Sequence, residues 1–443
     1  MHPHCHLNLN TILSQSSSYC KAIFAESEER IVKLILHADI NNFFASVECV
    51  LSPKLAGVPL AVAGNIETRS GIILAKNYLA KAKGVKTGDA IWQAKQKCPN
   101  LITVLPNYSA YRHFSKVVTA IYERYTDKIE GMGLDECWLD VTKTIHLFLP
   151  DKENKLDLFE KGEILAKKIQ DTVFNETGLG ISIGVSFNKL FAKLGSDMKK
   201  PKGITVLSSE NFTKKTYHLP ISDVVGIGRQ TRKKLAKMNI FTIGDFAHAD
   251  SKILKNKFGI VGNQMQQKIL GIDTEEVGIF TEKPPPKSVG NGTTLVKDAI
   301  SKEEIQSVLS LLCSKVAMRL REQNLGATCI SVGIKTFDFN YFSHDKRIPF
   351  VTNNEKEIFD QVCLLLDSFW DYKMPVRSIR IATSRLASTS QFVQLSFFQN
   401  NNSYKLDEAV DKIRNKYGFY KIEPAKSFSS PKTSQSFEIE IID

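Results

Sequence analysis

The chain has 443 residues, with 59 Lys and Arg against 47 Asp and Glu, so its formal net charge is +12. At roughly 100 to 200 residues per domain, this length predicts two to four folded units. A hydrophobic content of 42% with 24% charged residues is that of an ordinary globular protein, and it excludes a disordered chain or a single small disulfide scaffold. The positive balance favours a polyanionic partner without identifying it.

The chain carries no signal for export or membrane insertion. Its eight cysteines are scattered without a CxxC pair, which argues against a zinc ribbon and for reduced thiols. No run approaches the roughly 18 apolar residues of a membrane span, and residues 1–30 lack the apolar core of a signal peptide. We therefore expect a cytoplasmic protein with no membrane partner. His2, His4, Cys5 and His6 allow a metal site, but we interpret residues 1–30 as a disordered extension.

The first half of the chain alternates strand and helix patterns. A strand is predicted over 31–38 and a helix from Phe43 onwards, where apolar residues recur at helical spacing. Further strands are predicted at 59–63, 71–75, 134–141 and 181–187, and further helices at 77–83, 90–97, 111–125, 162–177 and 188–198. This order suggests an α+β core with helices on one face of a sheet, interrupted by a small basic insert at 42–107.

The second half begins with short helices around glycine turns, which run from Gly203 to about residue 280. Three prolines in TEKPPPKSV at 281–289 hold the backbone extended and predict a linker. Beyond it, strands at 292–296, 329–337 and 376–382 and helices at 301–323 and 354–369 predict a second α+β domain. An Asn- and Ser-rich stretch, a short basic helix ending at Tyr417 and a polar tail follow.

Three acidic residues are candidates for chemistry. Asp39 ends a buried-looking strand, where a carboxylate is costly unless it meets a cation or a donor. Asp135 and Glu136 enter another strand. Adjacent strand residues face opposite sides, but Gly131 and Gly133 just before them permit a bend. Together the three would suit two Mg²⁺ ions about 3.5 to 4 Å apart. By spacing alone, helix capping by Asp39 and solvated turn positions for the other two remain open.

Two further segments have candidate binding roles. VGIGRQTRKKL, starting at Val225, resembles a hairpin between two helices, whose glycines let backbone N–H groups approach a phosphate while basic side chains supply charge. An ordinary tight turn is the alternative. QLSFF at 394–398, flanked by polar sequence, has apolar anchors that suit a partner's groove, or forms a last edge strand.

Four motifs in order resemble the Y-family translesion DNA polymerases, of the bacterial polymerase IV and V or impB/mucB/samB type. They are HADINNFFASVE at 37–48, GLDECWLD at 133–140, FAKLGSDMKKPKG at 191–203 and the GIG of the basic hairpin. The resemblance implies a right-hand polymerase with a ferredoxin-like palm, small fingers, a helical thumb with a helix-hairpin-helix, and a C-terminal α+β little finger. The implied bounds are palm 31–41 and 108–200, fingers 42–107, thumb 201–280, linker 281–289, little finger 290–390, and a tail at 391–443 with a short helix.

The resemblance also implies residue roles. Asp39, Asp135 and Glu136 match the catalytic, metal-binding carboxylates, with the backbone carbonyl of Ile40 completing the shell around two Mg²⁺ ions. Phe44 matches the steric gate that leaves no room for a 2′-hydroxyl, while Phe43 is expected in the core. The nucleotide-binding positions are Tyr78, Lys81 and Lys193 for the triphosphate and Ile72 and Leu74 over the nascent base pair. DNA-binding positions are Gly226, Gly228, Arg229, Arg232 and Lys233, and a clamp-binding peptide is formed by Gln394, Leu395, Ser396, Phe397 and Phe398.

The implied function is low-fidelity, template-directed DNA synthesis past damaged bases, in which a primer 3′-hydroxyl attacks the α-phosphate of a deoxynucleotide. We see no second acidic group suited to a proofreading exonuclease. The implied partners are primer-template DNA, deoxynucleotides and a sliding clamp, for a monomeric protein. One alternative is a catalytically inactive DNA- and clamp-binding module, and another is a palm-type nucleotide cyclase. The intact acids speak against the first, and the thumb hairpin and linker-joined final domain against the second.

Overall fold

The computed structural model describes residues 32–149 without 68 and 70, 156–389 without 274 and 280–284, and 401–427 without 426 and without the side chains of 401–404. The predicted N-terminal extension and the peptide at 394–398 lie outside these residues. The elements group into two compact units, one of Met1–Asn41 with Phe114–Thr281 and the other of Asn42–His113 with Glu282–Asp443. Within the described residues, no helix is both long enough and apolar enough to cross a membrane.

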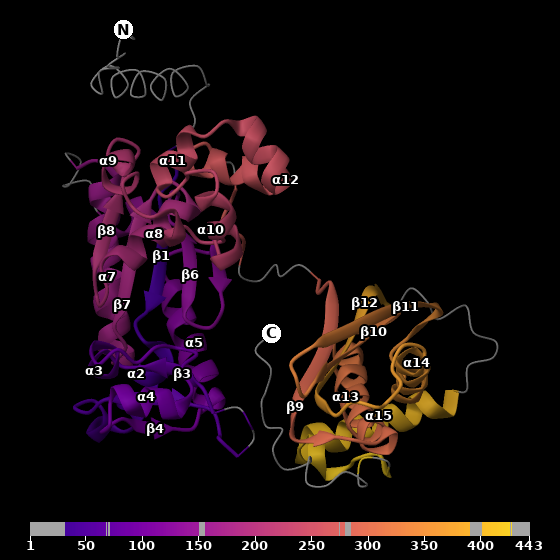
Figure 1. Cartoon of the computed structure of the whole chain (residues 1–443). Helices are drawn as coiled ribbons and strands as arrows, with labels where there is room; N and C mark the ends of the chain where they lie inside the picture. The colour runs from indigo at the N-terminus through magenta and orange to yellow at the C-terminus, as the bar shows by residue number, and fades with distance from the viewer. Residues whose placement is uncertain are drawn as a thin grey trace. The chain divides into compact units, whose positions relative to one another are not determined.

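The first unit is built on a five-stranded sheet with the order β5-β6-β1-β7-β8 (Figure 1). Its strands are β1 (Ile35–Ile40), β5 (Ile129–Met132), β6 (Glu136–Asp140), β7 (Ile181–Ser186) and β8 (Ile204–Leu207). β1 is antiparallel to both β6 and β7, and every residue of β1 and β7 is buried. The central strands therefore hold their side chains in a fixed, water-excluded environment.

Helices cover both faces of this sheet, whereas we expected them on one face. A Cβ on Gly162 of α7 (Leu158–Thr177) would meet the side chain of Val185, while one on Gly184 would meet the backbone of α8 (Lys189–Met198). Val185 and Gly184 are adjacent in β7 and so point to opposite faces. The expectation was wrong because Gly184 has no side chain, which lets α8 pack directly on the strand.

Small helices follow β8 and form a core with α8. They are α9 (Phe212–Thr216), η3 (Ile221–Asp223), α10 (Arg229–Ala236), α11 (Ile243–His248) and α12 (Ser251–Ile269), the last broken at Gly259. Leu190, Phe191 and Leu194 of α8 pack with Leu235 and Ile243 in this core. α8 therefore joins the sheet to the helices that follow. β8 extends the sheet beyond residue 200, where we expected the palm to end.

The second unit contains two sheets. The smaller has the order β3-β2-β4 and consists of β2 (Leu60–Ala63), β3 (Ile73–Lys76) and β4 (Ile102–Val104). The helices of this region are α2 (Phe43–Leu51), η1 (Pro53–Leu55), α3 (Tyr78–Ala82) and α4 (Ile91–Lys97). The helix α5 (Tyr108–Tyr122) begins in this unit and ends in the first one, to which α6 (Ile145–Phe148) also belongs.

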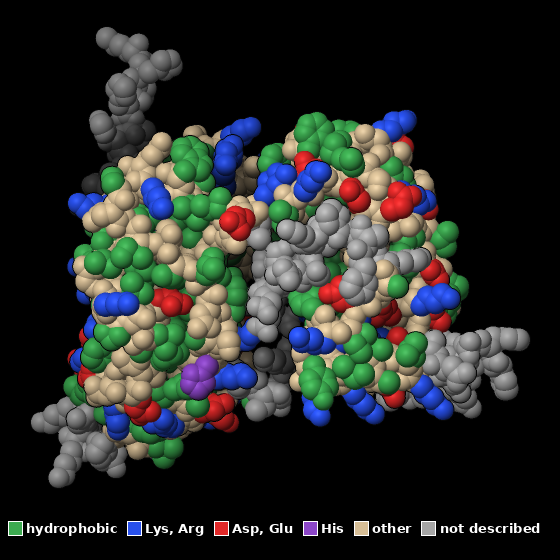
Figure 2. All heavy atoms as spheres, turned by 90° about the horizontal axis from the view of Figure 1, so that it is seen from below, with side chains coloured by type: hydrophobic (Ala, Val, Ile, Leu, Met, Phe, Trp, Pro, Cys, Tyr) green, Lys and Arg blue, Asp and Glu red, His purple; other side chains and the backbone are tan. Residues whose placement is uncertain are grey.

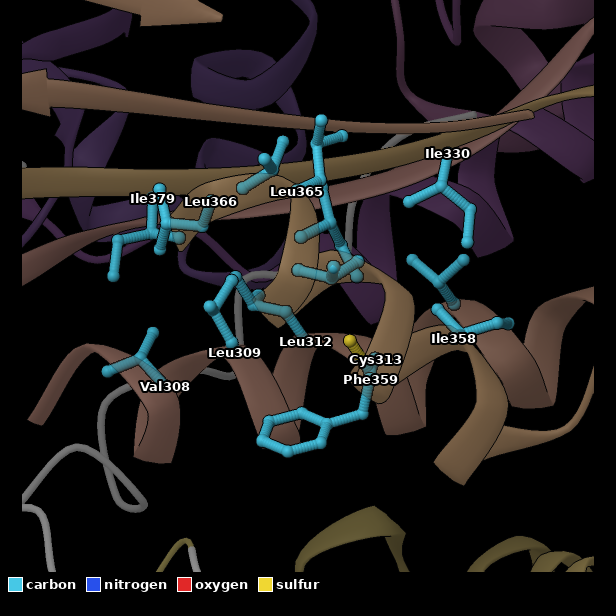
Figure 3. Packing of buried hydrophobic residues seen from close by; sticks show 14 of the residues in the cluster. Val308, Leu309, Leu312, Cys313, Ile330, Ile358, Phe359, Leu365, Leu366 and Ile379 are labelled. Carbon is cyan, nitrogen blue, oxygen red and sulfur yellow. The ribbon is translucent and has the colours of Figure 1, made fainter. Parts of the chain in front are cut away.

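The larger sheet is antiparallel, with the order β11-β10-β12-β9. Its strands are β9 (Ser288–Ala299), β10 (Leu325–Thr336), β11 (Tyr341–Thr352) and β12 (Val376–Ser388). Figure 3 shows its core, where Leu309 and Leu312 of α13 (Lys302–Glu322) and Leu366 of α14 (Glu355–Asp367) meet Ile330 and Ile379 of the sheet. This is the second α+β domain predicted from the sequence, except that β11 was not expected.

The C-terminal helix α15 (Asn401–Tyr417) is held on these helices by charges, and η5 (Phe419–Lys421) follows it. Arg321 of α13 contacts Asp411 at 2.6 Å and Asp407 at 3.1 Å. Arg414 is buried, and its guanidinium lies 3.3 Å from Glu355 of α14. The helix predicted to end at Tyr417 is thus docked on the second α+β domain.

Candidate active site

The fold brings the three candidate acids together on neighbouring strands. Asp39 in β1 is the register partner of Glu136, the first residue of β6. Asp135 lies just before β6, and its carbonyl accepts a 2.9 Å hydrogen bond from the N–H of Ile40. Gly133 has a φ of +81°, a conformation that glycine adopts without strain, so the chain turns where the sequence predicted a bend. This bend places the carbonyl of Asp135 beside Ile40 and Glu136 opposite Asp39.

Burial and mutual contact perturb all three carboxyl groups. Burial raises the pKa of Asp39 to about 6, against the opposing effect of the Lys200 charge. Burial and the charge of Glu136 also raise the pKa of Asp135. Burial alone would raise the pKa of Glu136, but the nearby His37 ring at 3.4 Å and the Lys193 ammonium at 2.9 Å outweigh it and hold that pKa below its usual value. Such perturbed groups in one place are typical of a reactive site.

Two lysines, one in α8 and one just after it, neutralise the acids. Lys193 of α8 lies 2.9 Å from Glu136 and 3.3 Å from Asp39. Lys200, just past α8, lies 2.6 Å from Asp39, and both ammonium groups also contact Asp197, at 3.2 and 2.7 Å. From its sequence alone Lys193 passes as a surface residue, yet it is only 7% exposed. The acids raise the pKa of both lysines, although burial by itself would lower it.

Lys200 and Asp197 were missed in the sequence reading, although both stand within FAKLGSDMKKPKG. The signal was available, because Lys200 follows Lys193 by seven residues and stands two residues after the end of α8. Asp140, by contrast, has the structural role expected of it, since its carboxylate accepts a 3.0 Å hydrogen bond from the backbone N–H of Thr142.

The donor set at this site fits a hard divalent cation. Its available ligands are carboxylate oxygens, which Mg²⁺ prefers, and the position already attracts two ammonium groups. Among the residues that the structure describes, no three acidic, His or Cys side chains stand close enough to count as a preformed metal cage. The oxygens of Asp39 and Glu136 that would bind a metal contact Lys193 and Lys200 instead. A cation entering here must therefore displace ammonium groups.

The paired phenylalanines at the start of α2 divide as expected in burial. Phe43 is 3% exposed and belongs to the core. Phe44 is partly exposed, and its ring stacks on Tyr111 at 4.2 Å and meets Tyr108 edge-on at 5.9 Å. The hydroxyl of Tyr111 donates a 2.5 Å hydrogen bond to Glu48, one helical turn after Phe44. The Phe44 ring is therefore held in place by the two tyrosine rings.

The other expected nucleotide-binding residues lie in the second unit, on β3 and α3. Ile72 is 45% exposed and precedes β3, and Leu74 is a partly buried residue of β3 at a β-bulge in its pairing with β2. Tyr78 and Lys81 occupy one side of α3, with the Lys81 ammonium 5.6 Å from the centre of the Tyr78 ring. The four side chains thus leave polar and apolar surface accessible to a ligand.

The basic hairpin has the expected turn, with one difference. Gly226 has a φ of +89° and Gly228 caps α10, which begins at Arg229. Arg232 and Lys233 are exposed on α10, whereas Ile227 is buried and anchors the turn. The element before the hairpin is the three-residue helix η3 rather than a full α-helix. The basic side chains that follow the turn are exposed to solvent.

Comparison with known proteins identifies the family. Residues 38–197 match the model of the impB/mucB/samB family, and residues 286–397 match that of its C-terminal domain. DNA polymerase IV of Acetivibrio thermocellus is 38% identical over 88% of this chain and 96% of its own length. DNA polymerase IV 1 of Bacillus subtilis is 35% identical, over 87% and 91%.

A solved structure agrees with these relatives. A Y-family DNA polymerase chimera of Dbh and Dpo4 superposes with a TM-score of 0.68 at 26% identity, over 80% of this chain and 99% of the chimera. The right-hand fold class expected from the sequence is thereby confirmed. The chain belongs to the impB/mucB/samB family of Y-family DNA polymerases.

Proposed function

We propose that this protein is a template-directed DNA polymerase that extends primers past damaged bases with low fidelity. The observation that carries the proposal is the register pairing of Asp39 with Glu136, with Asp135 tied to Ile40, opposite two lysines. The relatives named DNA polymerase IV support the same activity. The protein would act as a monomer in the cytoplasm, where the chromosome of a bacterium lies.

Polymerases of this family depend on divalent metal ions, and we assign the metal ligands here to Asp39, Asp135, Glu136 and the carbonyl of Ile40. When bound, a pair of Mg²⁺ ions lowers the pKa of the primer 3′-hydroxyl and stabilises charge on the leaving pyrophosphate. The protein's part is to hold the carboxylates on rigid strands. Lys193 and Lys200, released from the acids, would reach phosphate oxygens of the incoming nucleotide, where negative charge develops.

Sugar selection is assigned to Phe44. Its stacking on Tyr111 at 4.2 Å prevents the ring from yielding to a 2′-hydroxyl. Phe44→Ala should therefore increase ribonucleotide incorporation, measured as the ratio of kcat/KM for the two sugars. Phe43→Leu is the matched control, because it alters the neighbouring ring and keeps the core filled. Unchanged sugar discrimination in Phe44→Ala would remove the gate assignment.

The remaining contacts follow from the family. Tyr78 and Lys81 would bind the triphosphate, Ile72 and Leu74 would cover the nascent base pair, and the hairpin residues would bind the DNA backbone. On the face shown in Figure 2, Lys and Arg side chains lie at many separate points between apolar surfaces. The peptide at 394–398 would bind a sliding clamp.

A primer-extension assay tests the proposal. The wild-type chain with Mg²⁺, four deoxynucleotides and intact or lesion-containing templates should extend the primer, and Asp135→Ala should not. Asp140→Asn is the matched control, since the carboxylate of this acid accepts hydrogen bonds from the backbone N–H and the hydroxyl of nearby Thr142. Synthesis by Asp135→Ala at the wild-type rate would refute the assignment. DNA binding without extension by the wild-type chain would indicate an inactive binding module instead.

A further inference from the structure

Asn41 is a buried amide that the proposed chemistry does not use. It follows the last residue of β1, two positions after Asp39, and is 5% exposed. Its Oδ1 accepts a 2.8 Å hydrogen bond from the backbone N–H of Lys202, and its Nδ2 donates a 2.9 Å hydrogen bond to the hydroxyl of Ser182 in β7. Because a backbone N–H only donates, the oxygen of the amide must face Lys202. Asn41 therefore joins the end of β1 to the turn at 199–203, between α8 and β8.

A second buried amide holds the other side of the same residue. Gln170 of α7 is 7% exposed, and its Nε2 donates hydrogen bonds to the carbonyl of Lys202 at 3.1 Å and to that of Ile181 at 3.0 Å. The peptide groups before and after Lys202 are thus each bound by a side chain from a different element. A buried amide is costly unless its polar atoms are satisfied, so an apolar side chain would serve better as simple core filling.

The turn at 199–203 has a conformation that needs such support. Lys202 has a φ of +55°, in the left-handed region that residues with a side chain disfavour. A Cβ on Gly203 would lie 2.1 Å from the carbonyl oxygen of Lys199, so the chain closes tightly on itself here. Lys200 lies inside this turn, and its ammonium is 2.6 Å from Asp39. The side chain of Lys200 therefore extends to the acid from a backbone that the two amides hold.

We propose that Asn41 and Gln170 position the Lys200 ammonium beside Asp39, and so fix where this charge stands when a nucleoside triphosphate binds. Both are positioning residues, which act on Lys200 through the backbone of the turn. The inference rests on the proposed function, because it takes Lys200 as a phosphate-binding group. Displacing such a group by about 1 Å can cost about 100-fold in rate.

A purely structural role is the alternative, in which the amides only hold β1, α7 and the turn together. The two roles differ in whether the effect of Asn41 on nucleotide binding depends on Lys200. Residues that act through one another show non-additive effects when both are replaced, whereas independent residues show additive ones. A double-mutant cycle therefore separates the two roles.

The cycle measures kcat and KM for a deoxynucleotide in primer extension by the full chain. Lys200→Met should raise the nucleotide KM about 10- to 100-fold, as expected for the loss of one hydrogen bond to a charged group. Asn41→Ala should raise it in the wild-type background and cause no further rise in the Lys200→Met background. Asn41→Asp should recover most of the affinity, because it keeps an oxygen for the Lys202 N–H and the Ser182 hydroxyl can donate to it.

Amide hydrogen exchange of residues 199–203 in the free protein gives a readout that needs no catalysis. Asn41→Ala and Gln170→Met should each speed this exchange, because each removes a hydrogen bond to the backbone of Lys202. Ser186→Ala is the matched control and should leave the exchange unchanged, since this buried serine of β7 donates to the carbonyl of Leu207, away from the turn. Exchange at the wild-type rate in both amide variants would overturn the inference.

The outcomes separate the inference from the proposed function. If Lys200→Met leaves the nucleotide KM unchanged, the phosphate-binding role of Lys200 is wrong and the inference falls with it. If Lys200→Met raises the KM while Asn41→Ala has no effect, or has the same effect in both backgrounds, positioning is wrong and the proposed function stands. Should Asn41→Ala fail to fold, Gln170→Met takes its place in the cycle, with the same two outcomes.

Discussion

Replacing Gly184 by Ala should damage the site without touching any of its charged residues. A Cβ at this position of β7 would lie 1.9 Å from the carbonyl oxygen of Ala192 and 2.5 Å from the backbone nitrogen of Ser196, both in α8. Ordinary contact begins near 3.4 Å, so α8 must move away from the sheet by about 1.5 Å. Both clashing atoms are backbone, and no side-chain rotation can relieve them.

The displacement has two expected effects. Forcing extra volume into a packed core costs about 1 to 3 kcal/mol of unfolding free energy. The movement is also about half of the 2.9 Å separation of Lys193 from Glu136, so the ion pairs on Asp39 and Glu136 would be lost. Misplacing catalytic groups by about 1 Å can cost about 100-fold in rate. Primer extension should therefore fall far more than the loss of folded protein explains.

The assay combines chemical denaturation with single-turnover primer extension at a temperature where the variant is folded. Gly131→Ala is the matched control, because it is also a strand glycine but its Cβ would meet nothing within 4 Å. A Gly184→Ala protein with wild-type stability and rate would show that α8 is not positioned by this contact. A variant that is destabilised but catalyses normally when folded would separate packing from site geometry.

Three further outcomes are expected. Arg321→Ala removes the guanidinium that pairs with Asp407 and Asp411, and this should weaken the free energy of docking of α15 by about 3 to 5 kcal/mol. Amide hydrogen exchange in α15 should then lose its protection, and unchanged protection would contradict the prediction. Burial lowers the pKa of Lys315 from 10.5 to about 8, so the unfolded chain binds more protons between these values and this group's contribution to stability rises with pH there. Lys315→Met removes the cost of burying this charge and should have a higher Tm than the wild type, by less at pH 10 than at pH 8. An equal difference in Tm at the two pH values would refute the prediction. DNA affinity should fall steeply as the salt concentration rises, because binding releases counterions from the DNA. An affinity that does not change with salt would exclude the basic surface as the DNA-binding surface.

The strands that the sequence revealed are those with a strong apolar pattern. β1 and β7 are continuous apolar runs, buried throughout, and were found to within a few residues. β11 was missed because seven successive residues from Tyr341 to Arg347 are exposed, so no alternation marks it. β5 and β8 have only four residues each, and the position of β8 in the sheet depends on its pairing with β7. Short or exposed strands depend on partners that periodicity does not encode.

A motif and a turn mark Asp39 and Glu136 in the sequence, and the structure pairs these two residues across β1 and β6, whereas their surroundings could not be predicted. Lysine on a helix is normally solvated, and only the packing of α8 against Gly184 explains why Lys193 is buried. Lys200 was overlooked because its contact with Asp39 joins residues 161 positions apart. His37 passed as one more residue of an apolar strand. In each case the sequence does not tell which distant residues the side chain contacts in the folded protein.

The balance of charge explains how such a site can stay assembled before any metal arrives. Buried ion pairs contribute little net stability, because the loss of hydration offsets their attraction. Lys193 and Lys200 are therefore poorly explained as devices for holding the fold together. They do neutralise Asp39 and Glu136, whose repulsion would otherwise push β1 and β6 apart at the point where they must pair. A divalent cation bound by Asp39 and Glu136 would take over this neutralising role, and Lys193 and Lys200 would then be free to pair with phosphates. The same side chains would thus serve the empty and the loaded state.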